Sequence, residues 1–191
     1  MSGQYKTIVA DPPWDVQRLA SPGAKGFGTQ EGVLRSVMLP YPTMSVEEIR
    51  ALPVGEMAAH DAHLYVWTIN RYVEQTYAIA RAWGFTPKTL LVWAKTPMGL
   101  GPGGAYSITT EYVLFASRGS LRATSRVDRT WWSWPRGRHS AKPDAFLDIV
   151  EQVSPGPYAE LFARRARFGW DYWGDESLGT ASLHARGEVP I

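Results

Sequence analysis

Short apolar runs alternate along this chain with segments in which apolar residues recur at helical spacing. The short runs are rich in β-branched and aromatic residues and are bounded by glycine, proline or charged residues, a pattern typical of buried strands. They predict strands over residues 5–10, 63–69, 89–95, 111–117, 158–163 and 170–173.

Helical periodicity predicts a helix over residues 71–83, ending at Gly84, and another over 144–153, with Pro143 near its start. Ser45, followed three residues later by Glu48, forms a capping-box pattern that predicts a short helix. The glycine-rich residues 21–29 and 98–106 predict loops, and the tail after Glu176 is expected to be weakly structured.

Strands that alternate with helices predict an α/β fold, with a doubly wound, mostly parallel central sheet flanked by helices. The chain has 191 residues, enough for one domain with a substantial core. No internal repeat or linker composition interrupts it. We therefore expect one domain over residues 1–176 and a C-terminal tail over 177–191.

Composition excludes several kinds of chemistry. Cysteine is absent, which removes disulfides, thiolate nucleophiles and cysteine-bound zinc, and which fits a reducing compartment. The four histidines show no metal-ligand spacing, so we expect no metal. No apolar stretch reads as a signal peptide or membrane span, so we expect a cytoplasmic protein without a membrane partner. A net charge of +2 says little about partners.

The most informative residues follow the first predicted strand: Asp11, Pro12, Pro13 and Trp14. The prolines end the strand because neither can donate a hydrogen bond to a sheet. They leave a carboxylate, carbonyl acceptors and a large aromatic ring at a strand's carboxyl end, where ligands bind in open α/β sheets. The alternative is a purely structural turn, since Asx-Pro commonly opens turns.

These groups suit the alkylation of an exocyclic amine on a planar base. The amine is a poor nucleophile because its lone pair is delocalised into the ring. Asp11 and the Pro12 carbonyl are acceptors that could grip both amine hydrogens and favour a tetrahedral nitrogen facing a sulfonium methyl. The charge of Asp11 would stabilise the developing ammonium. Trp14 offers a face on which the base could stack.

With residues 11–14, the chain resembles the MT-A70 family of S-adenosylmethionine-dependent adenine-N6 methyltransferases, and most closely its short prokaryotic and phage branch. Further family-like segments follow in family order from about Tyr5 to Asp175. They are the Tyr-Pro-Thr-Met segment at 41–44 with its helix, the strand at 64–67, the Trp-Ala-Lys-Thr strand at 93–96, and the segments at 140–144 and 154–164.

The resemblance implies a Rossmann-like methyltransferase fold with a permuted motif order, in which the catalytic motif comes first and the cofactor motif near the end. It implies S-adenosylmethionine as the cofactor and Lys142 as a contact of that cofactor. Glu160 also lies on an apolar strand, where a carboxylate is costly unless it is paired or bound to ligand. The expected cofactor contacts are Val9, Ala10, Asp11, Lys142, Glu160, Phe162, Arg164, Asp175 and Glu176.

The chain departs from the family pattern at two places. Asp175 stands where the family usually has Asn, and Ala166 and Arg167 stand where other members have His-Asn. We therefore expect ribose recognition to differ from that of the eukaryotic branch.

Residues 118–142 carry many basic side chains and three tryptophans against one acidic residue. Charge that follows a phosphate backbone and rings that stack on bases suit a single strand or a flipped base. The alternative is a solvated loop with its tryptophans folded onto the core. The expected substrate contacts are Trp14, Tyr41, Lys95, Arg118, Trp131, Trp132, Trp134, Arg136, Arg138 and His139.

The leading hypothesis is S-adenosylmethionine-dependent N6 methylation of adenine in nucleic acid, single-stranded or flipped out of a duplex. DNA is favoured because the short prokaryotic and phage members lack an RNA-binding module. The alternatives are RNA methylation, a catalytically silent nucleic-acid-binding subunit, and methylation of a protein amide, which Asp11 disfavours. The sequence leaves open a homodimer or a partner subunit.

Overall fold

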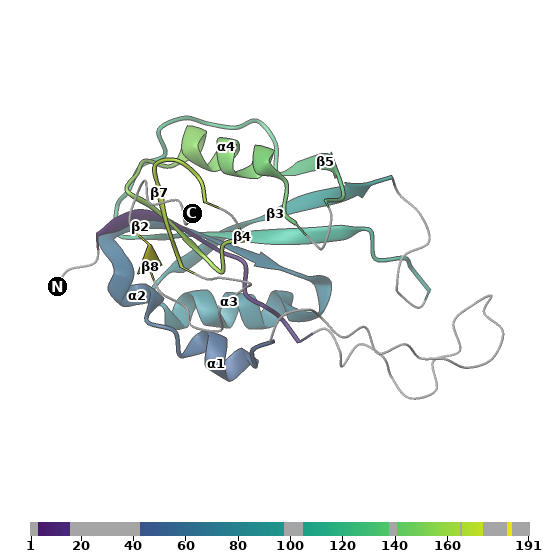
Figure 1. The fold of residues 1–191 in the computed structure, drawn as a ribbon, viewed down its shortest axis with the longest axis horizontal. Coiled ribbons are helices and arrows are strands. Elements are labelled where there is room, and N and C mark those ends of the chain that lie inside the picture. The colour runs from purple at the N-terminus through teal and green to yellow at the C-terminus, as the bar shows by residue number, and fades with distance from the viewer. Residues whose placement is uncertain are drawn as a thin grey trace.

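The computed structural model describes residues 4–15, 43–97, 105–137, 141–164 and 166–173, and the backbone of residues 183–184. Within these residues, one sheet of eight strands has the order β5-β3-β4-β2-β1-β6-β7-β8 (Figure 1). The strands are β1 (Tyr5–Ala10), β2 (Ala58–Thr68), β3 (Thr86–Thr96), β4 (Thr110–Arg118), β5 (Trp131–Pro135), β6 (Tyr158–Leu161), β7 (Trp170–Trp173) and β8 (Leu183–His184).

The sheet is mostly parallel, as predicted. Strand β1 pairs in parallel with β2 and β6, β3 with β5, and β6 with β7, whereas β4 runs antiparallel to β2 and β3, and β8 to β7. The carboxyl ends of β1, β2, β3, β5 and β6 therefore meet the start of β4 at one edge of the sheet. We call this edge the carboxyl edge.

Helices cover both faces of the sheet (Figure 1). On one side lie α1 (Val46–Arg50), α2 (Val54–Met57), the short 3-10 helix η2 (Asn70–Tyr72) and α3 (Val73–Ala82). The helix α4 (Asp144–Val153) lies on the other side. The predicted capping box starts α1, because the Glu48 N–H donates to Ser45 Oγ over 3.2 Å and the Ser45 N–H donates to Glu48 Oε2 over 2.7 Å. These observations confirm the Rossmann-like α/β fold.

Alternation along the central strands divides the core into two halves, because successive side chains of a strand point to opposite faces. Ile8 and Ala10 of β1 join the half beneath α1–α3, whereas Val9 joins the half beneath α4. In the α4 half, Phe146, Leu147 and Val150 pack against Tyr65, Trp67, Trp93 and Val113. Burial of apolar surface stabilises a fold by about 25 cal/mol per Å², and this free energy holds the sheet between its helices.

The observed elements differ from the predicted ones mainly at their ends. Strand β2 starts before residue 63, and η2 occupies the first turn of the expected 71–83 helix. Strand β6 ends at Leu161 because Phe162 has a positive φ of 63°, which breaks the extended conformation. Strand β5, which lies inside the basic stretch, was not predicted. The expected loop at 21–29 lies outside the described residues, as do most of the 98–106 loop and most of the 177–191 tail.

Among the described residues, no helix is both long and apolar enough to cross a membrane. Nor do the described His, Asp and Glu residues include a group of three or more that could hold a metal ion.

Candidate active site

Asp11 follows β1 at the point in the sheet where the strand order changes direction. Strand β1 is flanked by β2 on one side and by β6, which comes much later in the chain, on the other. In open α/β sheets such a switch point opens a crevice at the carboxyl ends of the strands. The Asp11 N–H donates to the Leu161 carbonyl over 3.2 Å, which fixes Asp11 against the end of β6.

A tight turn follows Asp11. The Trp14 N–H donates to the Pro12 carbonyl over 2.8 Å, closing a three-residue turn, and the Met44 N–H donates to the Pro13 carbonyl over 3.0 Å. Trp14 Nε1 donates to the Trp67 carbonyl over 3.0 Å. The two prolines and these three hydrogen bonds hold the Asp11 carboxylate and the Pro12 carbonyl in fixed directions at the edge.

The position of the Trp14 ring corrects one expectation. The ring stacks on Tyr72 at a centroid distance of 4.9 Å and an interplanar angle of 16°, and the residue is only 6% exposed. A ring covered in this way is an anchor for the turn rather than an open face for a base. The motif alone could not reveal this, because the covering side chain comes from η2, far along the chain.

Lys142 connects two carboxylates at this edge. Its Nζ lies 2.7 Å from Asp11 Oδ1, 2.8 Å from Asp11 Oδ2 and 3.6 Å from Glu111 Oε2. Glu111 also forms an ion pair with Lys95. We call Asp11, Lys142, Glu111 and Lys95 the charged network. It joins the end of β1, the segment before α4, the start of β4 and the end of β3.

Sheet geometry explains why these four residues meet. Glu111 and Lys95 follow the same alternation as Val113 and Trp93, which face α4. Asp11 continues the alternation of Val9 on the same face, and Lys142 lies two residues before the start of α4. Lys142 Nζ lies 5.3 Å from the centroid of the Trp67 ring, and Lys95 Nζ lies 5.2 Å from that of Trp93, so tryptophan rings form the floor of the network.

Glu111 is a site residue that was not predicted from the sequence. A signal was present, because Glu111 begins a strand that is otherwise apolar, and a carboxylate there is costly unless it is paired. Glu111 is indeed buried.

The net charge of the network depends on Lys142. Burial alone would lower the pKa of its ammonium group, but the neighbouring carboxylates of Asp11 and Glu111 outweigh burial, and the pKa is raised. Lys142 is therefore a permanent cation between two carboxylates at physiological pH. Arg164 lies close enough for its positive charge to oppose that of Lys142.

Glu160 lies beside the network at the end of β6, paired in register with Val9 of β1. Burial, followed by repulsion from Asp11, raises the pKa of its carboxyl to about 7, although Arg167 and Lys142 oppose the shift. An acid that titrates near neutrality at a sheet's carboxyl edge is characteristic of a functional site.

The residues expected to bind the cofactor are not equally accessible. Val9 and Ala10 are fully buried, so only their backbones can face a ligand. Phe162 holds its positive φ while its N–H donates to the Trp173 carbonyl and its ring meets the Trp173 ring edge-on at 5.1 Å. Such backbone strain in a bulky residue concentrates at functional sites. Phe162, Arg164 and Glu160 thus follow one another around the end of β6.

Arg167, which occupies a family His-Asn position, is engaged by α4. Its Nε and Nη2 each lie 2.8 Å from a Glu151 carboxylate oxygen, and Nη2 lies 2.6 Å from Asp148 Oδ1. Trp170 Nε1 donates to the same Glu151 over 2.6 Å. These contacts tie the segment before β7 to α4.

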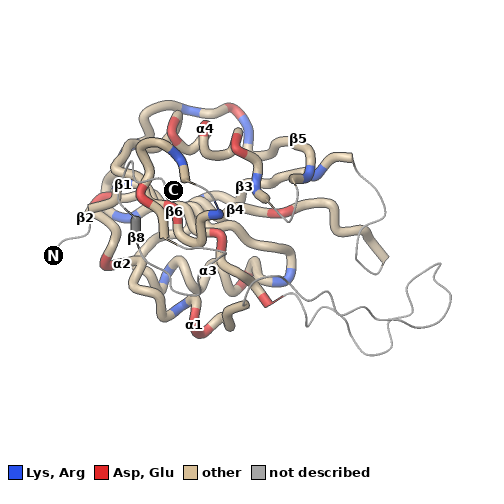
Figure 2. The backbone as a smooth tube through the Cα atoms, in the orientation of Figure 1, with Lys and Arg blue, Asp and Glu red and all other residues tan. Residues whose placement is uncertain are grey.

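The structure divides the basic stretch between two ends of the sheet. Trp132 and Trp134 stack at 5.6 Å with an interplanar angle of 7°, and Trp134 pairs in register with Lys95 at the carboxyl edge. Trp131, which is 60% exposed, points to the opposite face, and Arg136 is exposed just beyond β5. Among the described residues, Figure 2 shows basic and acidic positions interspersed on both sides of the sheet.

The placement of Arg118 corrects a second expectation. It is the last residue of β4, away from the carboxyl edge, where it pairs in register with Ala62, and its guanidinium donates to the Gly55 carbonyl over 2.6 Å. The chain then passes the C-terminal end of α4, where the Thr124 N–H donates to the Val153 carbonyl over 2.8 Å. Only the later part of the stretch returns to the carboxyl edge. Arg118 and the residues of β5 are near neighbours in sequence, but the chain between them crosses from one edge of the sheet to the other.

Five expected contacts lie outside the described residues: Tyr41, Arg138, His139, Asp175 and Glu176.

Known proteins resemble this chain along nearly its whole length. Residues 5–176 match the family model MT-A70. The chain is 33% identical over 183 residues to the Type II methyltransferase M.MunI of Mycoplasma sp, a match that covers 91% of this chain and 78% of that protein.

Longer eukaryotic proteins match as well. One is a putative N(6)-adenosine-methyltransferase MT-A70-like protein of Medicago truncatula, 27% identical over 186 residues, 93% of this chain and 27% of that protein. Another is the N(6)-adenosine-methyltransferase catalytic subunit METTL3 of Homo sapiens, 25% identical over 170 residues, 85% of this chain and 26% of that protein. This chain spans about a quarter of these two relatives. Because the family model matches residues 5–176, the chain belongs to the MT-A70 family of adenine-N6 methyltransferases.

Proposed function

We propose that this protein transfers the methyl group of S-adenosylmethionine to the N6 amine of adenine in DNA, with Asp11 as the group that orients the amine. One observation carries the proposal. Asp11 stands at the switch point of the sheet, held by Lys142 on one side and by the backbone of β6 on the other. The proposed reaction takes place in the cytoplasm, in keeping with the absence of cysteine.

The residues at the carboxyl edge fit S-adenosylmethionine. The Lys142 ammonium suits the carboxylate of its methionine moiety. The Glu160 carboxyl suits ribose hydroxyls. Burial raises its pKa to about 7, and hydrogen bonds donated by hydroxyl groups would stabilise its charged form. When bound, the cofactor supplies an electrophilic methyl group on a sulfonium.

The protein's own residues do the orienting. Each carboxylate oxygen of Asp11 has two lone pairs, so Asp11 can accept one amine N–H while it keeps Lys142. The Pro12 carbonyl accepts from Trp14 and has a second lone pair for the other amine hydrogen. With both hydrogens held, the nitrogen lone pair points away from the two acceptors. The carboxylate then stabilises the positive charge that develops on N6 during transfer.

DNA is the proposed substrate for two reasons. The relative of similar length is named a Type II methyltransferase, whereas the two relatives named for adenosine are much longer than this chain. The stacked Trp132–Trp134 pair and Arg136 also suit an unpaired strand, since rings stack on bases and cations follow phosphates. A target adenine in a duplex would have to be flipped out.

The test is methyl transfer from labelled S-adenosylmethionine to matched single-stranded DNA, duplex DNA, RNA and a protein mixture. The product is read as N6-methyladenine by mass spectrometry of the nucleosides. We expect label in DNA, more in the single strand than in the duplex, and little in RNA.

Other outcomes would overturn the proposal in distinguishable ways. Label confined to RNA would identify an RNA methyltransferase, and label in protein alone would identify an amide methyltransferase. Cofactor binding without transfer to any substrate would identify a catalytically silent subunit.

A further inference from the structure

A cavity lies at the carboxyl edge, on the face of the sheet opposite to the charged network. Its volume is about 400 Å³, within the range of small-molecule sites. Asn70, from η2 beyond the end of β2, borders it on one side, and the start of β4 with the residues before it forms the rest. The lining includes Tyr106, Ser107, Ile108, Thr110 and Tyr112.

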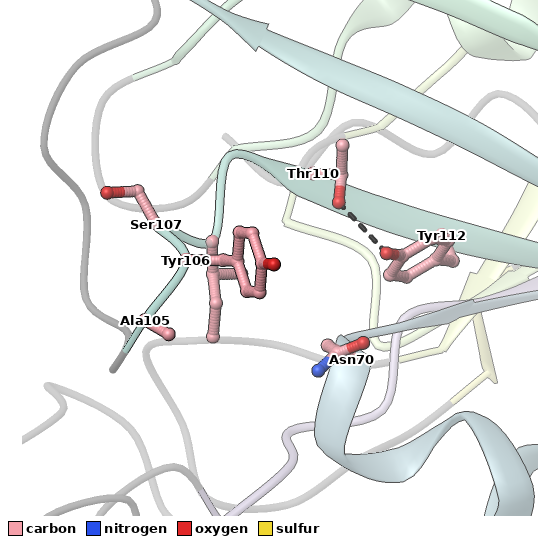
Figure 3. Close-up of a pocket in the computed structure, with 7 residues that line it drawn as sticks. Asn70, Ala105, Tyr106, Ser107, Thr110 and Tyr112 are labelled. Carbon is pink, nitrogen blue, oxygen red and sulfur yellow. Dashed lines mark hydrogen bonds between the residues drawn. The ribbon is translucent and has the colours of Figure 1, made fainter.

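The described side chains that line this cavity carry no charge. They include two tyrosine rings and several groups that can form hydrogen bonds. In Figure 3, Tyr106 and Tyr112 approach the cavity from opposite sides, and Asn70 lies at its lower border. Tyr106 is 87% exposed, so its ring is free to cover a ligand. Thr110 Oγ1 donates to the Tyr112 hydroxyl over 3.0 Å, which orients that hydroxyl without using its own proton.

The cavity is joined to the active site through two elements. On β4, Tyr112 follows Glu111 directly, and successive side chains of a strand point to opposite faces, so the strand end carries the charged network on one face and the cavity on the other. On η2, Asn70 lies two residues before Tyr72, the residue on which Trp14 stacks. A strand of nucleic acid that brings one base to Asp11 has to cross this edge.

We propose that this cavity binds a nucleobase next to the target adenine, with Asn70 reading the base edge and Tyr106 stacking on its face. The proposal rests on the proposed function and adds to it how the protein would select the bases next to its target adenine. An Asn amide carries both donors and an acceptor and can pair with a base edge in two hydrogen bonds. Aromatic rings stack on any base and so provide affinity without selectivity.

The chemistry of the lining favours a base over other ligands. The described residues that line the cavity include no Lys, Arg, Asp or Glu, so none of them offers a phosphate or a free cation a partner of opposite charge. The two tyrosine rings match a flat ligand, and the amide and hydroxyl groups match a ligand with polar edges.

The test uses single-stranded oligodeoxynucleotides with one adenine, in which each flanking position is changed in turn. Wild-type protein and Asn70→Ala are compared by kcat/KM for methylation and by fluorescence anisotropy for binding. We expect wild type to prefer one base at one flanking position by about tenfold, and Asn70→Ala to reduce that preference to within about twofold. Cofactor affinity should be equal in the two proteins.

Tyr106→Leu separates stacking from reading. It should weaken binding of every oligodeoxynucleotide by a similar factor and leave the base preference intact. Gln75→Ala, on α3, is the control and should change neither quantity.

Two results would overturn the proposal: a wild-type protein with no flanking-base preference, or an Asn70→Ala variant that retains the wild-type preference. Anisotropy reads the preference without turnover. A protein that binds with the expected preference but methylates none of the oligodeoxynucleotides would contradict the proposed function and leave the cavity assignment supported.

Discussion

Asp11 is held by a cation that must also serve the reaction. Lys142 contacts both oxygens of Asp11 and reaches Glu111, so one ammonium links the two carboxylates. In the proposed reaction, Lys142 keeps these acids together before the substrate arrives, and its positive charge attracts the carboxylate of the cofactor.

Replacing Lys142 with Met should therefore weaken cofactor binding and destabilise the fold. We expect a loss of about tenfold or more in affinity for S-adenosylmethionine, measured by calorimetry, and a lower free energy of unfolding by roughly 3 kcal/mol, because two partly buried carboxylates lose their shared partner. Lys88→Met, at an exposed lysine of β3, is the matched control. Equal cofactor affinity in the two variants would contradict the role of Lys142.

Glu160 should make stability depend on pH. Its carboxyl titrates near 7 in the folded protein and at about 4.5 in the unfolded chain. Between these values the folded protein binds a proton that the unfolded chain has released, so stability falls as the pH rises through this window. Relative to Glu160→Gln, wild type should lose about 2 to 3 kcal/mol of unfolding free energy between about pH 5 and pH 8. Parallel pH profiles of the two proteins in denaturant titrations would show that Glu160 is not perturbed.

The helix η2 links the elements that form the site. Tyr72 stacks on Trp14, and its hydroxyl donates to the Asp15 carbonyl over 2.7 Å, so this short element fixes the turn after β1. The sequence predicted helix here, but it gave no indication that a tyrosine on it would cover Trp14.

Tyr72→Ala should misplace the turn that carries Asp11. We expect kcat to fall by about a hundredfold, with little change in cofactor affinity, and the free energy of unfolding to fall by roughly 3 kcal/mol. Tyr72→Phe keeps the stacked ring, so it should retain most of kcat and lose only about 1 kcal/mol of stability through the missing hydrogen bond. If both variants lost kcat equally, stacking on Trp14 would not be what positions the turn.

At the scale of the whole molecule, the carboxyl edge collects the chemistry and the opposite edge does not. Most of the fold could be predicted because β1–β4, β6 and β7 each carry an apolar run, whereas β5 lies inside the basic stretch. Asp11 could be predicted because it follows the first of these runs. The charged network could not, since Lys142 and Asp11 are 131 positions apart and meet only through sheet order. The separation of Arg118 from Trp134 and Arg136 could not be predicted for the same reason, because an antiparallel strand carries Arg118 to the opposite edge.

The two ends of the sheet should therefore differ in their contribution to DNA binding. Arg136→Ala should lower affinity for single-stranded DNA and reduce the slope of log K against log salt by about 0.7, the change expected for one lost phosphate contact. Arg118→Ala, compared as folded protein, should leave both the affinity and the slope unchanged. An equal loss in both variants would place nucleic acid along the whole basic stretch.

The most direct test of the central claim compares wild type with Asp11→Asn in a single turnover on single-stranded DNA. Asn keeps the size of the side chain but removes the charge and replaces one acceptor with a donor. We predict that N6-methyladenine formation slows by at least about a thousandfold, while affinity for S-adenosylmethionine changes by only a few fold. An Asp11→Asn variant that methylates adenine within about tenfold of the wild-type rate would contradict the assignment of Asp11 as the group that orients the amine.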